Sequence, residues 1–379
     1  MAVAVATAGT ALIVSGTQAD AAVSAPGTPI TVVARPDGWR GMPGVGSVLE
    51  YWTSASDGST QPATGAVFVP PGPTPPGGWP IVAFDHGSLG LGPDCGGQAE
   101  PEKGPWPDRR VHEDTFLRGF LTKGFALVAP DYLGLGRFDT GTHPYLELKT
   151  EASSTIDMVT AARTAHPELG RKWVVFGGSQ GGQAALGTGY LQRKLAPELD
   201  FRGTIALDPE SEVENLLPMA GPWGPDLPST IGDALTAVVV SILAGLRTGR
   251  PDAKVDGYLS PRGRQILDSV AKSCLDAIAD RVTGVGVSDL LSKPLSDNHF
   301  RAMLADYLGV PVSGYDRPIL LLLNALDLSV PSPLHAALVA RFAANHVDYR
   351  AVTGTGRHMQ LNKEMTAAVD EFLARVREA

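Results

Sequence analysis

Apolar residues recur along the chain in two alternating patterns, which predict buried strands and amphipathic helices. Short runs rich in β-branched, leucine and aromatic residues predict strands over residues 46–54, 65–69, 81–84, 125–132, 173–176, 201–207, 319–324 and 347–352. Helical spacing of apolar residues predicts helices over residues 111–123, 150–166, 183–195, 332–345 and 361–377. The first two strands are expected to pair antiparallel across a turn at residues 56–59. Beyond residue 81 strands alternate with helices, which predicts an α/β fold with a mostly parallel, doubly wound sheet.

Residues 211–312 break this alternation, because no strand-like run recurs and several segments have helical spacing. Residues 230–246 are apolar nearly all round, but Asp233 lies within them and Arg247 follows, so a stable membrane span is not expected. We interpret this segment as a buried helix of a helical cap at 211–312, inserted between core segments 23–210 and 313–379. Such an insertion is expected to shape the substrate site.

The N-terminal segment has the features of a secretory signal. Residues 2–14 form an uncharged apolar run that is too short to span a bilayer, and Ala19-Asp20-Ala21 fits an A-x-A cleavage site. We therefore predict a signal peptide at 1–22 and an extracellular protein, with a disordered alanine-rich tail as the alternative. Residues 23–45 are rich in Pro, Gly and Ser and are expected to be irregular.

Charge and cysteine content narrow the function classes. A net charge of −9 and a pI near 5.4 disfavour nucleic acid and anionic membranes as partners. The sequence contains no zinc-binding spacing, EF-hand loop or phosphate-binding G-x-x-x-x-G-K-[ST] motif, so no metal or other cofactor is expected. The two cysteines, Cys95 and Cys274, suggest one disulfide in an exported protein, or else two unrelated buried thiols.

The most informative motif is Gly177-Gly-Ser-Gln-Gly-Gly182, which lies between a predicted strand and a predicted helix. A G-x-S-x-G sequence in that context is the nucleophile elbow of α/β-hydrolases. Ser179 is thus the candidate nucleophile, and the N–H of Gln180 at the helix N-terminus is a candidate oxyanion donor. The alternative is a glycine-rich turn with an idle serine.

Asp327 and His358 complete a candidate catalytic triad in the chain order Ser, Asp, His that this fold uses. Both are expected in loops at the carboxyl ends of strands, where ligands gather in open α/β sheets. A serine becomes nucleophilic when a neutral imidazole accepts its proton and a carboxylate orients that imidazole. The competing histidines, His335 and His346, are expected to be surface or capping residues. The alternative for Asp327 is an aspartate that only caps its loop.

The loop after the strand at 81–84 is expected to supply the second oxyanion donor. It begins with His86-Gly87-Ser88, and we predict the N–H of Ser88 as this donor, with Leu89 as the neighbouring candidate. His86 precedes the nucleophile in the chain, so we expect it to fix this loop by a hydrogen bond rather than act as the base.

Several of these motifs together resemble the secretory lipase family, α/β-hydrolases of actinobacteria and fungi. They are His86-Gly-Ser-Leu-Gly90, Pro130-Asp-Tyr-Leu-Gly-Leu-Gly136, Thr142-His-Pro-Tyr-Leu146, Gly177-Gly-Ser-Gln-Gly-Gly182 and Asp327-Leu-Ser-Val-Pro331. The resemblance implies a helical cap after the strand that ends at Asp208 and a disulfide between Cys95 and Cys274. It also implies hydrolysis of carboxylic esters.

We therefore expect a secreted serine ester hydrolase of the lipase or carboxylesterase type, acting on small-molecule or lipid esters with hydrophobic acyl groups. One alternative is a serine peptidase of the same fold, which would need a charged anchor for a peptide terminus; no carboxylate among Glu210, Glu212 and Glu214 stands out as that anchor. The other is a catalytically inactive binding protein.

Overall fold

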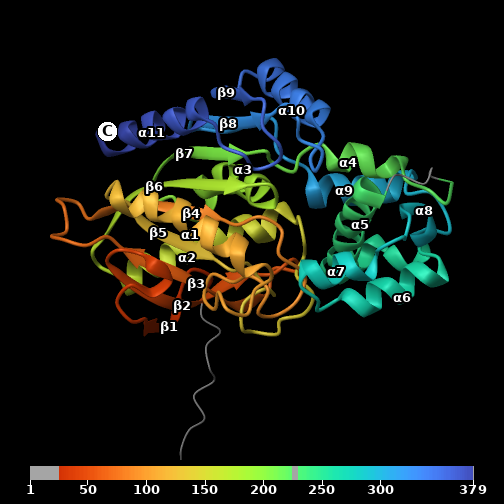
Figure 1. The fold of residues 1–379 in the computed structure, drawn as a ribbon, viewed down its shortest axis with the longest axis horizontal. Helices are drawn as coiled ribbons and strands as arrows, with labels where there is room; N and C mark the ends of the chain where they lie inside the picture. The colour runs from red at the N-terminus through yellow and green to blue at the C-terminus, as the bar shows by residue number, and fades with distance from the viewer. Residues whose placement is uncertain (1–24, 224–228, 379) are drawn as a thin grey trace, which may run out of the picture.

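The computed structural model describes residues 25–223 and 229–378, arranged around one nine-stranded sheet (Figure 1). The predicted signal peptide lies outside the described residues. The strand order is β1-β2-β3-β5-β4-β6-β7-β8-β9, antiparallel from β1 to β5 and parallel from β5 to β9. The predicted α/β architecture with a mostly parallel sheet is confirmed. The strands are β1 Pro29–Ala34, β2 Val45–Ser54, β3 Thr60–Val69, β4 Trp79–Asp85, β5 Ala126–Pro130, β6 Leu169–Gly178, β7 Asp200–Leu207, β8 Ile319–Asn324 and β9 Tyr349–Gly354.

Helices cover both faces of the sheet because the central strands are apolar on both sides. In β6, Val174 and Phe176 pack in one cluster with α1 (Pro107–Thr122) and α11 (Lys363–Glu378). Their neighbours Trp173 and Val175 pack in another cluster with α2 (Leu148–Ala165) and α3 (Gln180–Leu195). Helix α10 (Ser332–Ala344) packs against β8. The alternation of side chains along one strand thus joins two helical layers.

The prediction of an irregular segment at residues 23–45 is wrong, because it contains β1 and the short 3₁₀ helix η1 (Trp39–Gly41). β1 forms the edge of the sheet and pairs antiparallel with β2. Its side chains are half-buried or exposed, so the strand lacks the apolar run that marks its neighbours. Backbone pairing with β2, which composition does not reveal, decides its conformation.

The chain between β7 and β8 is helical, as predicted, and its helices gather at one end of the molecule (Figure 1). They are α4 Val213–Leu216, η2 Leu217–Met219, α5 Ser229–Gly249, η3 Pro251–Ala253, η4 Val255–Gly257, α6 Pro261–Val270, α7 Leu275–Arg281, α8 Val287–Leu290 and α9 Asn298–Leu308. These helices share a hydrophobic cluster of their own, which Tyr145 and Leu146 of the core also join. The exact boundaries of a cap domain stay a prediction.

Helix α5 contains a stretch that would be long and apolar enough to cross a membrane, Gly232–Gly249. Over half of this stretch, 56%, is buried inside the structure. Buried core helices of soluble proteins have the same length and composition, so the stretch is weak evidence for a membrane span. Its burial agrees with the expectation of a buried helix.

Candidate active site

Ser179 occupies a sharp turn between β6, which ends at Gly178, and α3, which begins at Gln180. Its φ of 58° and ψ of −123° are strained for a residue with a side chain. A Cβ atom on Gly177 would lie 1.9 Å from the carbonyl oxygen of Gly181, and one on Gly181 would lie 1.9 Å from that of Asp85. Strand and helix therefore approach too closely for side chains at both positions, as the motif predicted.

The structure brings the three predicted triad residues together. His358 Nε2 lies 2.9 Å from Ser179 Oγ, and His358 Nδ1 lies 2.7 Å from Asp327 Oδ2. Asp327 follows β8, and His358 lies in the loop between β9 and α11. Both distances are those of hydrogen bonds. An imidazole in this position is able to accept the serine proton while the carboxylate stabilises the resulting cation.

The carboxylate of Asp327 is fixed by its loop as well as by His358. Its Oδ1 accepts hydrogen bonds from the backbone N–H groups of Ser329 at 2.8 Å and Val330 at 3.0 Å. Burial by itself would raise the pKa of Asp327, but hydrogen bonds from His335 and His358 and the charge of His358 outweigh it and lower this pKa. Asp327 therefore remains ionised, as a partner of an imidazolium must.

The expectation that His335 is a surface or capping residue is wrong. Its side chain on α10 is buried, and its Nε2 lies 3.3 Å from Asp327 Oδ2, the oxygen that His358 also contacts. The first turns of α10 lie beside the loop that carries Asp327, which brings the imidazole to the carboxylate. His346 is exposed at the end of the same helix, as expected.

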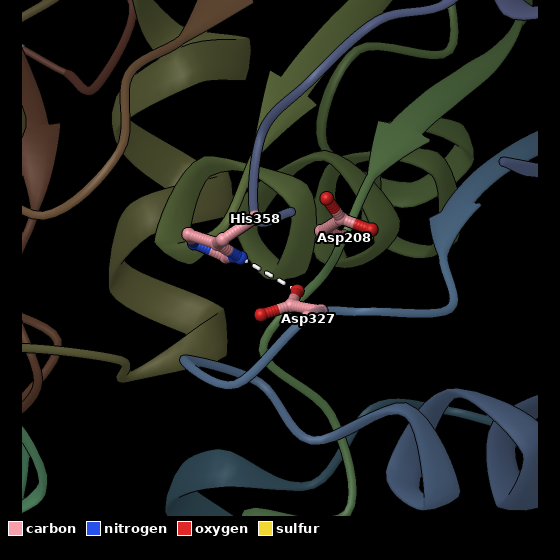
Figure 2. Close-up of side chains that lie close together, drawn as sticks. All are labelled: Asp208, Asp327 and His358. Carbon is pink, nitrogen blue, oxygen red and sulfur yellow. Dashed lines mark hydrogen bonds and ion pairs between the residues drawn. The ribbon is translucent and has the colours of Figure 1, made fainter. Parts of the chain in front are cut away.

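Asp208, directly after β7, connects the loops that carry Asp327 and His358, the two other residues labelled in Figure 2. Its carboxylate accepts hydrogen bonds from the backbone N–H and the side-chain amide of Asn324, each at 2.7 Å, and from the N–H of Met359 at 2.8 Å. Asn324 ends β8 and Met359 follows His358, so this carboxylate fixes the ends of two loops.

By distance alone Asp208, Asp327 and His358 might be taken for a cation site, because one ligand atom of each lies within 4.8 Å of the others. Backbone and amide N–H donors hold both oxygens of Asp208, and the imidazole Nδ1 is hydrogen-bonded to Asp327. A metal ion would have to displace these bonds. Figure 2 shows the hydrogen bond that joins His358 to Asp327, with Asp208 beside them.

The two predicted oxyanion donors lie on either side of the nucleophile. The N–H of Gln180 opens α3, and that of Ser88 lies in the loop after β4. Within the described residues neither N–H donates a hydrogen bond, and neither does that of Leu89. The side chain of His86 is buried and fixes this loop by a hydrogen bond, as expected, because its Nδ1 lies 2.7 Å from the carbonyl oxygen of Gly87.

Buried polar side chains support both candidate donors. Ser88 Oγ is hydrogen-bonded to the hydroxyl of Tyr145 at 2.7 Å. The side-chain amide of Gln180 donates to Glu151 Oε1 at 2.6 Å and lies 2.9 Å from His143 Nε2. These contacts fix residues on both sides of Ser179. No motif in the sequence predicts these contacts, because the partner residues belong to the loop between β5 and α2 and to α2 itself.

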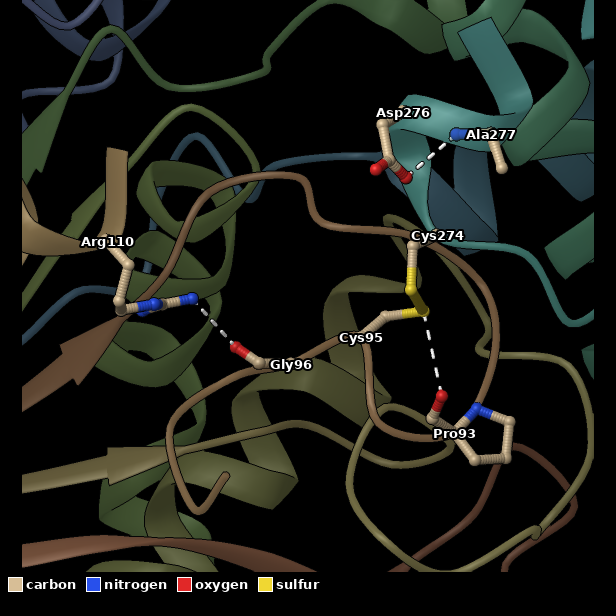
Figure 3. The surroundings of a disulfide bond; sticks show 7 residues. All are labelled: Pro93, Cys95, Gly96, Arg110, Cys274, Asp276 and Ala277. Carbon is tan, nitrogen blue, oxygen red and sulfur yellow. Dashed lines mark hydrogen bonds between the residues drawn. A yellow bond between two sulfur atoms is a disulfide. The ribbon is translucent and has the colours of Figure 1, made fainter. Parts of the chain in front are cut away.

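The disulfide between Cys95 and Cys274, which the family resemblance implied, is present (Figure 3). It joins the loop after β4 to the residue that precedes α7. Two backbone hydrogen bonds accompany it, from Leu91 to Ser273 at 2.9 Å and from Leu275 to Leu89 at 2.8 Å. The loop that carries Ser88 is thus attached directly to the helical insertion.

Comparisons with known proteins agree with this architecture. The secretory lipase family matches residues 110–297, which include the elbow and much of the insertion. The fold is similar to that of Candida antarctica lipase A, with a TM-score of 0.71 at 16% identity over 89% of this chain and 78% of that one. It is also similar to a putative hydrolase from Legionella pneumophila, with a TM-score of 0.70 at 18% identity over 92% and 97% of the two chains.

A third similar structure is the rice cell wall degrading esterase LipA from Xanthomonas oryzae, with a TM-score of 0.68 at 20% identity over 93% and 96% of the two chains. The chain matches none of the curated proteins. At these identities the solved structures establish the fold alone, and they confirm the predicted α/β-hydrolase fold. The family match confirms the resemblance drawn from the motifs.

Proposed function

We propose that this chain is a hydrolase of the lipase and esterase type that cleaves carboxylic esters through a covalent acyl-enzyme on Ser179, and its match to the secretory lipase family supports this proposal. The observation that carries this proposal is the hydrogen-bonded line from Asp327 through His358 to Ser179, with distances of 2.7 and 2.9 Å. It supports the activation of a serine hydroxyl by an oriented imidazole.

In the proposed first half-reaction, Ser179 Oγ attacks the ester carbonyl carbon while its proton passes to His358 Nε2. The tetrahedral intermediate carries its negative charge on the former carbonyl oxygen, which the N–H groups of Gln180 and Ser88 stabilise. Asp327 stabilises the imidazolium. The intermediate then collapses to the acyl-enzyme as His358 gives its proton to the departing alcohol oxygen.

The second half-reaction repeats these steps with water. His358 takes a proton from a water molecule, whose oxygen attacks the acyl carbonyl. Collapse of the second intermediate breaks the bond to Ser179 Oγ, which recovers its proton from His358. The products are the carboxylic acid and the free enzyme, and the proposal requires no cofactor.

We further propose that the protein is secreted and that residues 211–312 form a cap that selects esters with hydrophobic acyl groups. The family name and the disulfide, which forms in oxidising compartments, support secretion. The hydrophobic cluster within the insertion supports an apolar lining. The proposed signal peptide at 1–22 and its A-x-A site belong to the same hypothesis.

The test is a comparison of p-nitrophenyl esters of increasing acyl length with aminoacyl anilides, for the wild type and Ser179→Ala. We expect ester turnover in the wild type to exceed anilide turnover, and the variant to lose about six orders of magnitude in kcat. A phosphonate should label Ser179 covalently. The matched control is Ser269→Ala, which changes an exposed serine of α6 and should keep full activity.

Anilide cleavage that exceeds ester cleavage would favour a peptidase of the same fold. Absence of turnover with either substrate class would favour an inactive binding protein. Full esterase activity in Ser179→Ala would exclude the proposed nucleophile.

A further inference from the structure

Glu210 is a buried carboxyl group next to the nucleophile that the mechanism above does not use. It lies two residues beyond Asp208 at the end of β7, and its backbone N–H donates to the carbonyl oxygen of Ser179 at 3.2 Å. The residue is only 7% exposed. Within the described residues its carboxyl group has no hydrogen bond and no ion pair.

The two acidic residues that follow Glu210, unlike Glu210 itself, have a charged partner. Glu212 Oε1 accepts a hydrogen bond from Arg341 at 2.9 Å, and a carboxylate oxygen of Glu214 lies 3.7 Å from the same guanidinium group. Both are therefore held by a partner on α10, which leaves Glu210 as the unpaired member of these three carboxylates among the described residues.

Glu210 interacts electrostatically with charged groups of the site. Burial raises the pKa of Glu210 to about 7, the charge of His358 opposes this, and the charges of Asp327 and Glu151 add to it. The charge of Glu210 in turn helps burial to raise the pKa of Tyr145, whose hydroxyl is hydrogen-bonded to Ser88. The contact that places Glu210 at the site is its backbone hydrogen bond to Ser179.

A buried carboxyl group without a partner is destabilising, because it loses water and gains nothing in exchange. Such groups are concentrated at functional sites, where a ligand supplies the missing partner. Arg341 shows that the fold is able to pair acidic residues of this segment, yet it leaves Glu210 free. The missing partner is therefore expected to come with the substrate.

We propose that Glu210 is a substrate-binding residue whose carboxyl group accepts a hydrogen bond from a hydroxyl or protonated amine on the alcohol part of the ester. We assign the alcohol part because Glu210 follows Asp208, whose carboxylate holds the N–H of Met359 beside His358, and His358 gives its proton to the alcohol oxygen. The inference rests on the proposed function and adds to it a substrate class, esters of alcohols that carry a hydrogen-bond donor near the scissile bond.

The experiment compares propyl butanoate with 2-hydroxyethyl butanoate, which are similar in size and differ by a hydroxyl donor. The readout is the ratio of their kcat/KM values. We expect the wild type to favour the hydroxyl ester about tenfold, as suits one hydrogen bond to a charged acceptor. Glu210→Leu should abolish this preference and Glu210→Gln should reduce it. Glu212→Gln, which removes the same charge two residues away, should keep the wild-type ratio.

A second pair of esters separates the two possible donors. If 2-(dimethylamino)ethyl butanoate is favoured over 3-methylbutyl butanoate and the hydroxyl pair shows no preference, the ligand is an ammonium group. A preference in either pair that disappears in Glu210→Leu supports the inference. Equal ratios in the wild type and in Glu210→Leu for both pairs would overturn it while leaving ester hydrolysis intact. Absence of ester turnover in the wild type would instead overturn the proposed function.

Thermal unfolding gives a readout that is independent of substrate. The pKa of Glu210 is raised from 4.5 to about 7, so the native state loses stability as the pH rises through this interval and the carboxyl group must ionise. Glu210→Gln cannot ionise and should therefore melt above the wild type at pH 8 but not at pH 4. If Glu210 instead has a structural role, Glu210→Gln should be less stable than the wild type at both pH values, and that result would also overturn the inference.

Discussion

Asp327 accepts hydrogen bonds from two backbone N–H groups and faces two imidazoles, although a catalytic carboxylate needs only one. The second imidazole, that of His335, lies 3.3 Å from Asp327 and 3.6 Å from Asp208. Among the residues that the structure describes, His335 has no hydrogen bond or ion pair with Ser179, so we interpret it as a positioning residue. It keeps the carboxylate directed at His358.

We predict that His335→Ala lowers kcat about tenfold with little change in KM, since it removes one hydrogen bond to a charged acceptor. His335→Gln places an amide nitrogen near the former Nε2 and should recover part of the loss. Steady-state kinetics with p-nitrophenyl butanoate measure both values. His346→Ala, which changes an exposed histidine two residues beyond the end of this helix, is the control. A normal kcat in His335→Ala would show that the backbone donors suffice to hold Asp327.

The positions of the three residues of the proposed triad were predictable from the sequence, because each lies in the turn or loop that follows the carboxyl end of a predicted strand. Asp208 meets the same criterion, yet its contacts with Asn324 and Met359 depend on the pairing of β7 with β8, which no local pattern specifies. His335 was misjudged because its position in a helix gives no indication of which face is buried against the Asp327 loop. Contacts between loops are set by sheet order, and sheet order was the missing information.

At the scale of elements, the turn from β6 to α3 is the part of the fold that tolerates least change. Gly181 must leave room for the carbonyl oxygen of Asp85, which a Cβ atom would meet at 1.9 Å. The clashing atom belongs to the backbone of β4, so a rotamer change cannot relieve it. The elbow, the oxyanion loop and the central strands therefore depend on one another.

We predict that Gly181→Ala destabilises the protein by about 3 kcal/mol or more, because overpacking here displaces backbone rather than side chain. The midpoint of urea unfolding measures this change. Gly119→Ala in α1 is the matched control, since a Cβ atom at that position meets nothing within 4 Å and alanine favours the helix by up to about 1 kcal/mol. If Gly181→Ala is as stable as the wild type, β4 and α3 are able to move apart without a loss of unfolding free energy.

Element prediction succeeded where burial produces a pattern and failed where it does not. The strand over 319–324 was predicted with its observed bounds, since β8 is buried along its whole length. β1 was missed, because four of its six side chains are exposed and edge pairing alone defines it. Sequence patterns report burial, so an element without burial leaves no trace in them.

At the scale of the whole molecule, the helical insertion and the sheet are joined at the loop that carries Ser88. The bonds there are the disulfide and the two backbone hydrogen bonds of Leu91 and Leu275. The disulfide spans 179 residues of sequence, so it closes a very long loop in the unfolded chain. Chain-entropy arguments give such a cross-link a large effect on stability.

We predict that the double variant Cys95→Ser, Cys274→Ser loses about 5 kcal/mol of unfolding free energy, the value expected for a loop of this length. The double replacement avoids leaving one reactive thiol. Urea unfolding of the variant and of the oxidised wild type measures the difference, and Ser269→Ala serves as a neutral control. The bridge also holds the loop of Ser88 against the insertion. In the double variant we therefore expect ester turnover to fall at urea concentrations below those that unfold the sheet. Simultaneous loss of activity and of structure would indicate that insertion and sheet unfold as one unit, and that the bridge stabilises the molecule without separately positioning the oxyanion loop.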